Sequence, residues 1–408
     1  MRSKLGRNVI GLGAVSLFTD ISTEMIYPLL PIFLAGVLGA NASFIGAIEG
    51  AAETTASLLK LLSGWWSDKV KSRKPFVVIG YLIASIVRPF TGAAQTASQV
   101  LAIRVTDRVG KGLRTSPRDA LLADSAPADA RGLAYGFHAA ADNTGAVLGP
   151  LIAFLLLKLH GVGALDASQH LSPHDEHAIR NVFFLSAIPA AIAMLILILV
   201  VQDVKRTPDG AKPAETPEAA GKLSRRFWAY LTVVLLFTLG NSTDAFLLLR
   251  ANQLGVPVAL APILWALLNF VKAATGTYGG QLSDRIGRRP LIVGGWLLYA
   301  AVYFAFAWAG VAWQAWVLFA IYGIFYGMTE GTEKALVADI VPAIRRGAAF
   351  GWYNLAIGLG ALPASLIFGW IWDRSGSSSA FVFGATLALV AAVMMAFVAP
   401  ASRLREAK

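Results

Sequence analysis

Apolar stretches about twenty residues long recur along the whole chain, and they limit what it can fold into. A helix of that length spans the ~30 Å hydrocarbon core of a bilayer. Of the 408 residues, 56% are hydrophobic and only 14% are charged, whereas soluble domains carry roughly 25% charged residues. The chain is therefore expected to be an all-α integral membrane protein.

The apolar pattern predicts about twelve transmembrane helices in two groups of six. The expected spans lie near residues 9–35, 44–65, 76–96, 99–122, 131–157, 180–201, 228–250, 258–280, 289–310, 314–338, 347–371 and 379–399. Between the sixth and seventh lies "QDVKRTPDGAKPAETPEAAGKLSRR", whose Pro, Lys and Arg are typical of a flexible linker. The predicted domains are residues 1–201, a linker at 202–226, and residues 227–408.

Lysine and arginine gather in alternate connections and at both ends of the chain. The opposite connections "AGVLGANAS", "GAAQTAS" and "WAGVAW" contain neither residue. The positive-inside rule then places both termini and the linker in the cytoplasm. The first span is expected to be a transmembrane helix that is kept, rather than a cleaved signal peptide. This topology explains most of the net charge of +11, so a nucleic-acid partner is not expected. The predicted location is a bacterial inner membrane.

Two segments of the first half return in the second. "ALLADSAPADARGLAYG" (120–136) returns as "ALVADIVPAIRRGAAFG" (335–351), and "SGWWSDKVKSRKP" (63–75) returns as "GGQLSDRIGRRP" (279–290). Parallel duplicated halves are typical of secondary transporters. A membrane-embedded enzyme would need a nucleophile with its base, or a cluster of metal ligands, and the sequence has neither pattern. The chain also has no cysteine, and no bound cofactor is expected.

The repeated loop resembles the motif G-x-x-x-D-R/K-x-G-R-R/K of the major facilitator superfamily. The second copy matches fully, and in the first copy Lys71 and Ser72 replace a single glycine. The resemblance implies two pseudo-symmetric six-helix bundles that work by alternating access, with the loop as a gate. Together with the inner ends of the fourth and tenth spans, this gives ten candidate gate residues: Gly64, Asp68, Lys69, Arg73, Arg118, Gly280, Asp284, Arg285, Arg289 and Glu333.

The fifth span is similar to a motif of the drug/proton antiporters in that superfamily, G-x8-G-x3-G-P-x2-G-G. Gly136, Gly145, Gly149 and Pro150 match it, whereas Ala153 and Phe154 replace the closing glycines. The resemblance implies antiport, usually export. Gly145, Gly149 and Pro150 are hinge candidates, although close helix packing would require the same residues.

Charged side chains inside the membrane are concentrated in the first, fourth, seventh and tenth spans. Each costs about 2.5–3.5 kcal/mol at mid-bilayer, so such residues are usually paired or functional. The superfamily fold places these four spans around its central cavity. The candidate substrate-binding residues are Tyr27, Arg104, Asp107, Arg108, Lys111, Asp244, Asn269, Tyr326 and Glu330. The cations of the fourth span favour a solute that carries a carboxylate or phosphate.

Asp20 and Glu24 are one helical turn apart and share a face of the first span. Two acids this close do not both ionise easily in a low dielectric, so one is expected to hold a proton. Proton coupling is one interpretation, and simple pairing with Arg104 and Arg108 is the other. His138 and Asp142 have the same spacing, which suggests a proton relay or a packed, hydrogen-bonded histidine.

These features predict a proton-coupled secondary transporter, not an enzyme, that acts as a monomer and exports a small organic solute. Symport uptake of an organic anion or metal chelate is an alternative, and a receptor on a transporter fold stays open. Metal-ion efflux is supported only by the histidines of one outer loop, His160, His170, His174 and His177.

Overall fold

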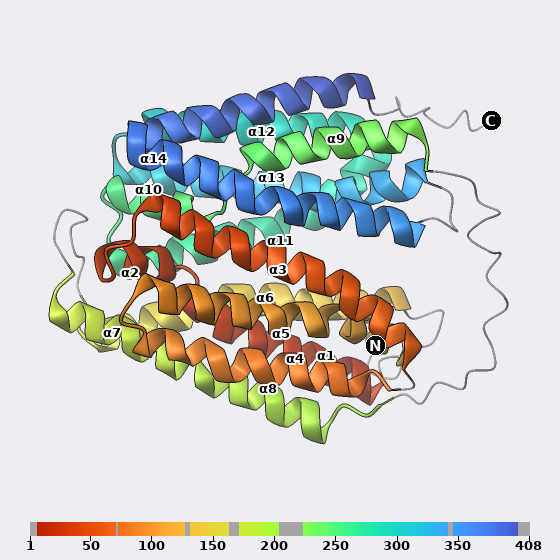
Figure 1. Ribbon diagram of the computed structural model, residues 1–408, viewed down its shortest axis with the longest axis horizontal. Coiled ribbons are helices and arrows are strands. Elements are labelled where there is room, and N and C mark those ends of the chain that lie inside the picture. The colour runs from red at the N-terminus through yellow and green to blue at the C-terminus, as the bar shows by residue number, and fades with distance from the viewer. Residues whose placement is uncertain are drawn as a thin grey trace. The chain divides into compact units, whose positions relative to one another are not determined.

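The computed structural model describes residues 6–70, 72–126, 131–162, 171–203, 223–341 and 346–398, and these residues form helices joined by short connections (Figure 1). The helices of the first half are α1 (Arg7–Ile26), α2 (Leu30–Gly36), α3 (Ala42–Lys69), α4 (Lys74–Val87), η2 (Arg88–Ala93), α5 (Ala97–Asp124), α6 (Arg131–Leu159), α7 (Pro173–Leu185) and α8 (Ala187–Leu199). Those of the second half are α9 (Arg225–Gly240), α10 (Ala245–Gln253), η5 (Val258–Leu260), α11 (Ala261–Ile286), α12 (Arg288–Trp308), α13 (Ala312–Ile340) and α14 (Arg346–Val398).

The helices confirm the expected twelve-span architecture. In the described part of the chain, eight helical segments are long and apolar enough to cross a membrane. The last of them belongs to α14, which has 53 residues and holds two spans, because Gly376 interrupts it with a φ of +84°. Three further helices, α3, α5 and α13, are as long as the others and carry the charged residues.

Several helices begin at polar side chains that satisfy their first backbone N–H groups. The Asn41 Oδ1 atom accepts a hydrogen bond from the Phe44 N–H (2.9 Å) at the start of α3. Thr96 and Gln99 bond to each other's backbone N–H groups at the start of α5. Such caps fix where the transmembrane segments enter.

The chain forms two compact units that do not coincide with its sequence halves. One unit contains Met1–Thr207 and Ala245–Ala266, and the other contains Pro208–Asp244 and Leu267–Lys408. In the first unit, α10 packs on α2 and α3, and η5 packs on α6. A piece of the second half thus belongs to the first unit, and domain boundaries at 201 and 227 stay a prediction.

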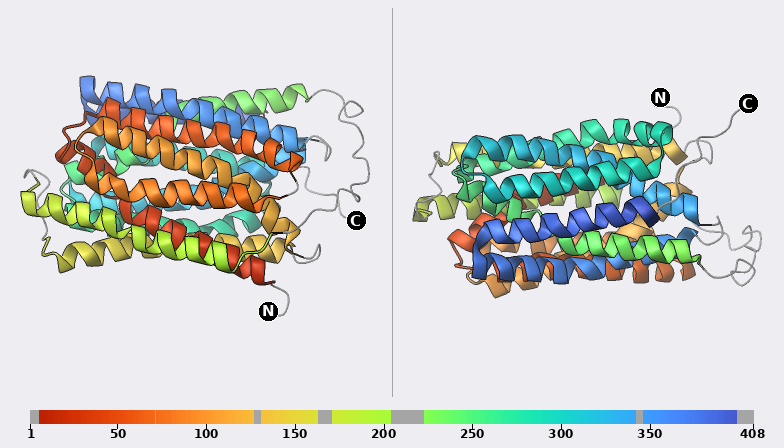
Figure 2. Two further views of the ribbon diagram at one scale, coloured as in Figure 1. Left: turned by 60° about the horizontal axis from the view of Figure 1, so that its bottom comes forward. Right: turned by 90° about the horizontal axis from the view of Figure 1, so that it is seen from above.

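The first unit is built on four tight helix pairs: α1 with α6, α1 with α8, α3 with α5, and α4 with α5 (Figure 2). Glycines let the backbones approach. A Cβ added at Gly145 would lie 2.6 Å from the Leu17 carbonyl oxygen, and one at Gly149 would lie 2.7 Å from the Ile21 carbonyl oxygen. Gly145 and Gly149 of the antiporter-like motif therefore hold α6 against α1, and the helix continues through Pro150.

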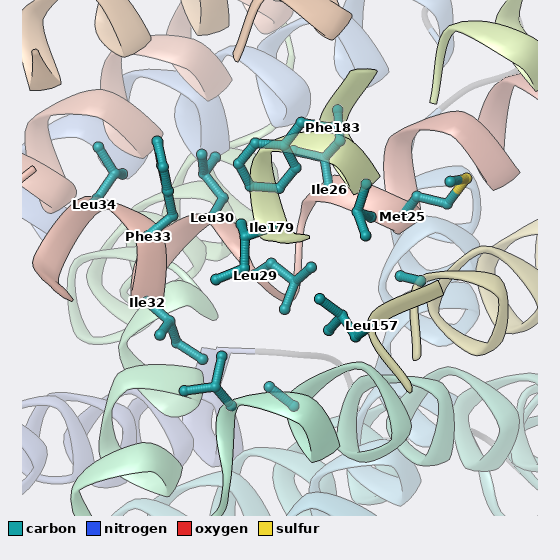
Figure 3. Close-up of a cluster of buried hydrophobic side chains, with 14 of the residues drawn as sticks. Met25, Ile26, Leu29, Leu30, Ile32, Phe33, Leu34, Leu157, Ile179 and Phe183 are labelled. Carbon is teal, nitrogen blue, oxygen red and sulfur yellow. The ribbon is translucent and has the colours of Figure 1, made fainter. Parts of the chain in front are cut away.

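A cluster of buried apolar side chains fills one end of the first unit (Figure 3). Phe33 of α2 packs edge-on against Phe183 of α7, with 5.3 Å between ring centroids. We call this set the apolar cluster. Its members from the first half include Met25, Ile26, Leu29, Leu30, Ile32, Ile45, Leu157 and Ile179, and from the second half Ala245, Val258, Ala259 and Ala261.

The second unit packs α14 against α9 and α12, and α12 against α13. Stacked rings form its centre, with 4.2 Å between the ring centroids of Phe237 and Trp296 and 4.1 Å between those of Tyr299 and Tyr303. The seventh span is divided: α9 ends at Gly240, and α10 begins at Ala245. Residues 241–244 between them are not helical.

A buried ion pair joins three helices of the first unit. Arg88, at the start of η2, donates to the Asp107 carboxylate of α5 (2.9 Å). It also donates to the Thr19 carbonyl oxygen (3.3 Å) and the Ser22 hydroxyl (3.0 Å) of α1. Both charged residues are at most 5% exposed. Asp107 thus faces the interior of the bundle.

We expect Gly149→Ala to destabilise the first unit by about 1–3 kcal/mol, because the added methyl group overpacks the α1–α6 contact. Thermal unfolding in detergent measures the effect as a lower midpoint temperature. Gly136→Ala in the same helix is the matched control, since a Cβ there meets no atom within 4 Å. Equal losses in the two variants would contradict the packing role.

We expect Asp107→Asn to reduce stability by about 3–5 kcal/mol, because it leaves the Arg88 charge buried without its partner. The double variant Arg88→Met/Asp107→Leu removes both charges and should recover much of the loss. Glu176→Gln is the control, since its side chain is 37% exposed in the Arg180 pair. Chemical unfolding in mixed micelles measures all three, and no recovery in the double variant would refute the pairing argument.

Candidate functional site

Two carboxylates of α1 form the centre of the candidate site. Asp20 and Glu24 are half-buried where the α6 glycines press on α1. The Glu24 Oε2 atom accepts a hydrogen bond from the indole Nε1 of Trp265 (2.6 Å). Among the described residues, Asp20 has no hydrogen-bond or ion-pair partner. The two acids therefore differ: one is fixed by a neutral donor, and the other is held by no polar contact.

The cations of α5 face these acids, but they do not all pair with them. Arg104 binds Glu49 of α3 through two hydrogen bonds (3.0 and 2.7 Å). Arg108 is 8% exposed, and its Nε atom has no hydrogen-bond partner. The Lys111 side chain makes no hydrogen bond or ion pair within the described residues. The alternative in which Arg104 and Arg108 pair with the α1 acids is not what the structure shows.

The uncommitted charges of α1, α3 and α5 lie close enough to influence one another. Lys111 is within electrostatic reach of Asp20, Glu24 and Glu53. Arg108 is within reach of Glu24 and Glu53. The site thus places two buried or half-buried cations beside three acids, and none of the five forms an ion pair with another described residue. Such an arrangement can gain a proton, or bind an ion, without breaking a salt bridge.

A second polar group lies along the α1–α6 contact. His138 Nδ1 and Asp142 Oδ2 are 3.5 Å apart, and the Ser16 hydroxyl of α1 donates to the other oxygen of Asp142. The buried Nε2 atom of His138 has no partner. Asp142 is also within electrostatic reach of Asp20. Titratable groups therefore follow one another along this seam, as a relay requires.

The second unit has a separate polar group around the break in the seventh span. The Asp244 carboxylate accepts hydrogen bonds from the hydroxyls of Tyr322 (2.8 Å) and Tyr326 (2.9 Å). Lys272 pairs with Glu330 (2.9 Å) and lies 4.6 Å from the centroid of the Tyr326 ring. Asn269 is half-buried on α11. Four of the predicted substrate-binding residues thus lie on three elements of this unit.

The predicted gate residues of the first unit lie near the ends of α3, α4 and α5. Arg73 is buried and pairs with Asp124, and Arg118 donates to the neighbouring Asp119 (2.8 Å). Gly64 faces Ser116, whose Cβ would be 3.3 Å from an added methyl group. The side chains of Asp68 and Lys69 lie outside the described residues.

In the second unit, Glu333 acts as an acceptor for neutral donors. Its carboxylate accepts from Trp296 Nε1 (2.8 Å) and the Tyr353 hydroxyl (2.7 Å), which ties α12 and α14 to α13. Arg285 is exposed and Arg289 half-buried at the α11–α12 turn. A Cβ at Gly280 would meet no atom within 4 Å. The side chain of Asp284 lies outside the described residues.

Sequence reasoning missed the partners that organise the site. Arg88 is the one charge inside the third span, and a lone buried charge needs a partner, but the sequence does not say which acid supplies it. Glu49 is one of two acids in the second span, with Glu53, and the sequence does not show which of them pairs with a cation. Trp265 donates a hydrogen bond to Glu24, and no sequence pattern indicates this contact.

The described residues contain no group of three His, Cys, Asp or Glu side chains placed to hold a metal ion. His160 and His174 bond to backbone carbonyl groups (2.8 and 2.6 Å), and His170 lies outside the described residues.

Comparisons with known proteins agree with the fold and the duplicated pattern. An uncharacterized MFS-type transporter of Methanocaldococcus jannaschii is 31% identical over 402 residues, which are 97% of this chain and 96% of the relative. The multidrug resistance protein MdtH of Salmonella arizonae is 29% identical over 158 residues, 38% of each chain. A crystal structure of a bacterial homolog of the human lysosomal transporter Spinster covers 96% of this chain, and 94% of its own, with a TM-score of 0.72 at 20% identity.

The model of the family described as the Major Facilitator Superfamily matches residues 12–332 and 249–408. These matches cover most of the chain, and a relative of the same type aligns with nearly all of it. The protein therefore belongs to the Major Facilitator Superfamily of membrane transporters.

Proposed function

We propose that this transporter couples proton movement to the export of a small organic solute by alternating access. The observation that carries the proposal is the state of Asp20, a half-buried carboxylate without a hydrogen bond or ion pair among the described residues. Lys111, Glu24 and Asp142 lie within electrostatic reach of Asp20. A carboxylate placed in this way can exchange a proton without breaking an ion pair.

The remaining acids extend this group into a path for protons. Glu24 lies one turn from Asp20 on α1, and Asp142 with His138 continues along α6. The loop and helix-end residues would act as the gate, with Arg73, Arg118 and Arg289 among them. The functional unit is a single chain in a bacterial inner membrane, with both termini in the cytoplasm. Export is supported by the partial similarity to a multidrug resistance protein.

Symport of an organic anion is the second candidate, and the α5 cations favour it. Arg108 and Lys111 offer donors to a carboxylate or phosphate. Protonation of Asp20 or Glu24 would remove negative charge beside these cations, so a proton and an anion would strengthen each other's binding. In antiport the solute and the proton must instead compete. The effect of lower pH on solute affinity therefore distinguishes the two candidates.

We expect Asp20→Asn and Glu24→Gln to abolish solute accumulation driven by a pH gradient while solute exchange continues, because the neutral side chains no longer exchange a proton. Proteoliposomes with an imposed gradient, loaded with a solute found by thermal-shift screening, measure both activities. Glu176→Gln, outside the site, is the control. Full gradient-driven accumulation in both site variants would rule out the coupling role.

We expect Arg108→Ala to weaken binding of an anionic solute by about tenfold or more, since a hydrogen bond to a charged group contributes about 1.5–3 kcal/mol. Thermal-shift titration with a carboxylic acid and its neutral amide measures the difference. Thr106→Ala changes an exposed position of the same helix and should leave both unaffected. Equal weakening for the acid and the amide would indicate a structural role instead.

A further inference from the structure

Trp265 belongs to the second half of the duplication, yet it contacts the proton-site helix of the first half. Its indole N–H donates to Glu24 (2.6 Å), and its ring centroid lies 4.9 Å from that of Tyr27. The residue is 6% exposed. It is the last residue but one of the segment Ala245–Ala266, which packs with the first unit.

The same segment supplies the second-half members of the apolar cluster. Ala245, Val258 and Ala259 are at most 6% exposed within the apolar cluster. α10 packs on α2 and α3, and η5 packs on α6. Figure 3 shows the α1 and α2 side chains of this cluster converging beside Leu157 and Ile179. This apolar contact forms at the end of α1 opposite the N-terminus, which the predicted topology places on the outer side.

A chain of contacts connects the Trp265 hydrogen bond to the charged site. The Arg104 guanidinium lies 5.8 Å from the Tyr27 ring centroid, and Arg104 is itself fixed by Glu49. Tyr27 in turn packs on Trp265. The position of the indole thus depends on side chains from α1, α3 and α5 at once.

We propose that the Trp265–Glu24 hydrogen bond is the latch of an outer gate, which holds the apolar contact closed while Glu24 is ionised. A hydrogen bond to a carboxylate is roughly twice as strong as one between neutral groups. Proton uptake by Glu24 therefore weakens the latch and lets the outer side open. The role of Glu24 as a proton site rests on the proposed function, whereas the existence of the gate does not depend on it.

Other charged groups that face Glu24 set when it ionises. They are Asp20 on its own helix and Arg104, Arg108 and Lys111 on α5. From α3, Glu49 and Glu53 act on those cations, and Gly149 of α6 packs against Glu24. The indole N–H can only donate a hydrogen bond. It therefore binds the carboxylate of Glu24 more strongly than the protonated acid, and it cannot take up the proton itself.

The latch explains how an unloaded carrier avoids a leak. Without a proton or solute, Glu24 stays ionised and the outer side stays closed. A proton can shift the equilibrium between the closed and the open outer side only if it binds the two states with different affinity. The hydrogen bond between Trp265 and Glu24 supplies this difference. Trp265 is thus a positioning residue for Glu24 and a gate residue at the same time.

A cysteine-labelling experiment tests the latch without knowledge of the solute. The chain has no cysteine, so Ala259→Cys places a single thiol in the apolar cluster. A membrane-impermeant maleimide added to the outer side of intact cells reports opening, and Gly310→Cys, at an exposed turn, normalises the labelling rate. Trp265→Phe retains an aromatic ring but removes the N–H donor, and Glu24→Gln removes the charge.

We expect Trp265→Phe and Glu24→Gln each to raise the normalised labelling of Ala259→Cys at least fivefold. The double variant should be labelled no faster than either single variant, because both substitutions remove the same hydrogen bond. Trp313→Phe, at a 64% exposed position, should leave labelling unchanged. Circular dichroism and the thermal midpoint confirm that the variants fold.

Unchanged labelling in folded Trp265→Phe would overturn the latch, as would additive effects in the double variant. A rise in Trp265→Phe without a rise in Glu24→Gln would overturn its dependence on charge. If the protein without these substitutions shows no transport driven by a pH gradient, the proposed function fails, and the labelling still decides whether the latch exists.

Discussion

The contact between α1 and α6 is the constraint on which the candidate site depends. Gly145 and Gly149 bring the α6 backbone within touching distance of α1 beside Asp20 and Glu24. A larger residue would separate the helices and admit lipid or water beside the acids. Close packing therefore keeps two carboxylates in a medium of low dielectric, where their ionisation is sensitive to a few neighbouring charges. The α6 glycines and the α1 acids therefore have to occur together for the site to form.

The first unit separates charges that hold the fold from charges that remain available. Arg88 with Asp107, and Arg104 with Glu49, are buried pairs with good hydrogen-bond geometry. Removing one member of such a pair is expensive, so these residues are suited to fixing helices. Asp20, Arg108 and Lys111 lie on the same helices and form no ion pair with another described residue. Rigid pairs thus surround a small set of groups that can change their charge or bind an ion.

Length and hydropathy predict most of the twelve spans, and the duplication and the loop pattern are needed for the charged helices α3, α5 and α13. The sequence also placed the charged side chains on the correct helices. The sequence did not identify which charges pair with each other. Arg104 could pair with an acid on α1 or on α3, and the structure shows that it binds Glu49 of α3. The Trp265–Glu24 contact joins residues of different halves, and a duplicated pattern contains no information about how one half meets the other. The roles of the individual site residues stay predictions.

The division of the seventh span has a structural consequence. Its lower piece, α9, is fixed in the second unit where Gly240 touches Gly384 of α14, and the tyrosines of α13 hold Asp244 just before α10 begins. The upper piece, α10, packs with the first unit. The non-helical residues 241–244 therefore separate a helix that belongs to one unit from a helix that belongs to the other, and neither helix continues across the boundary.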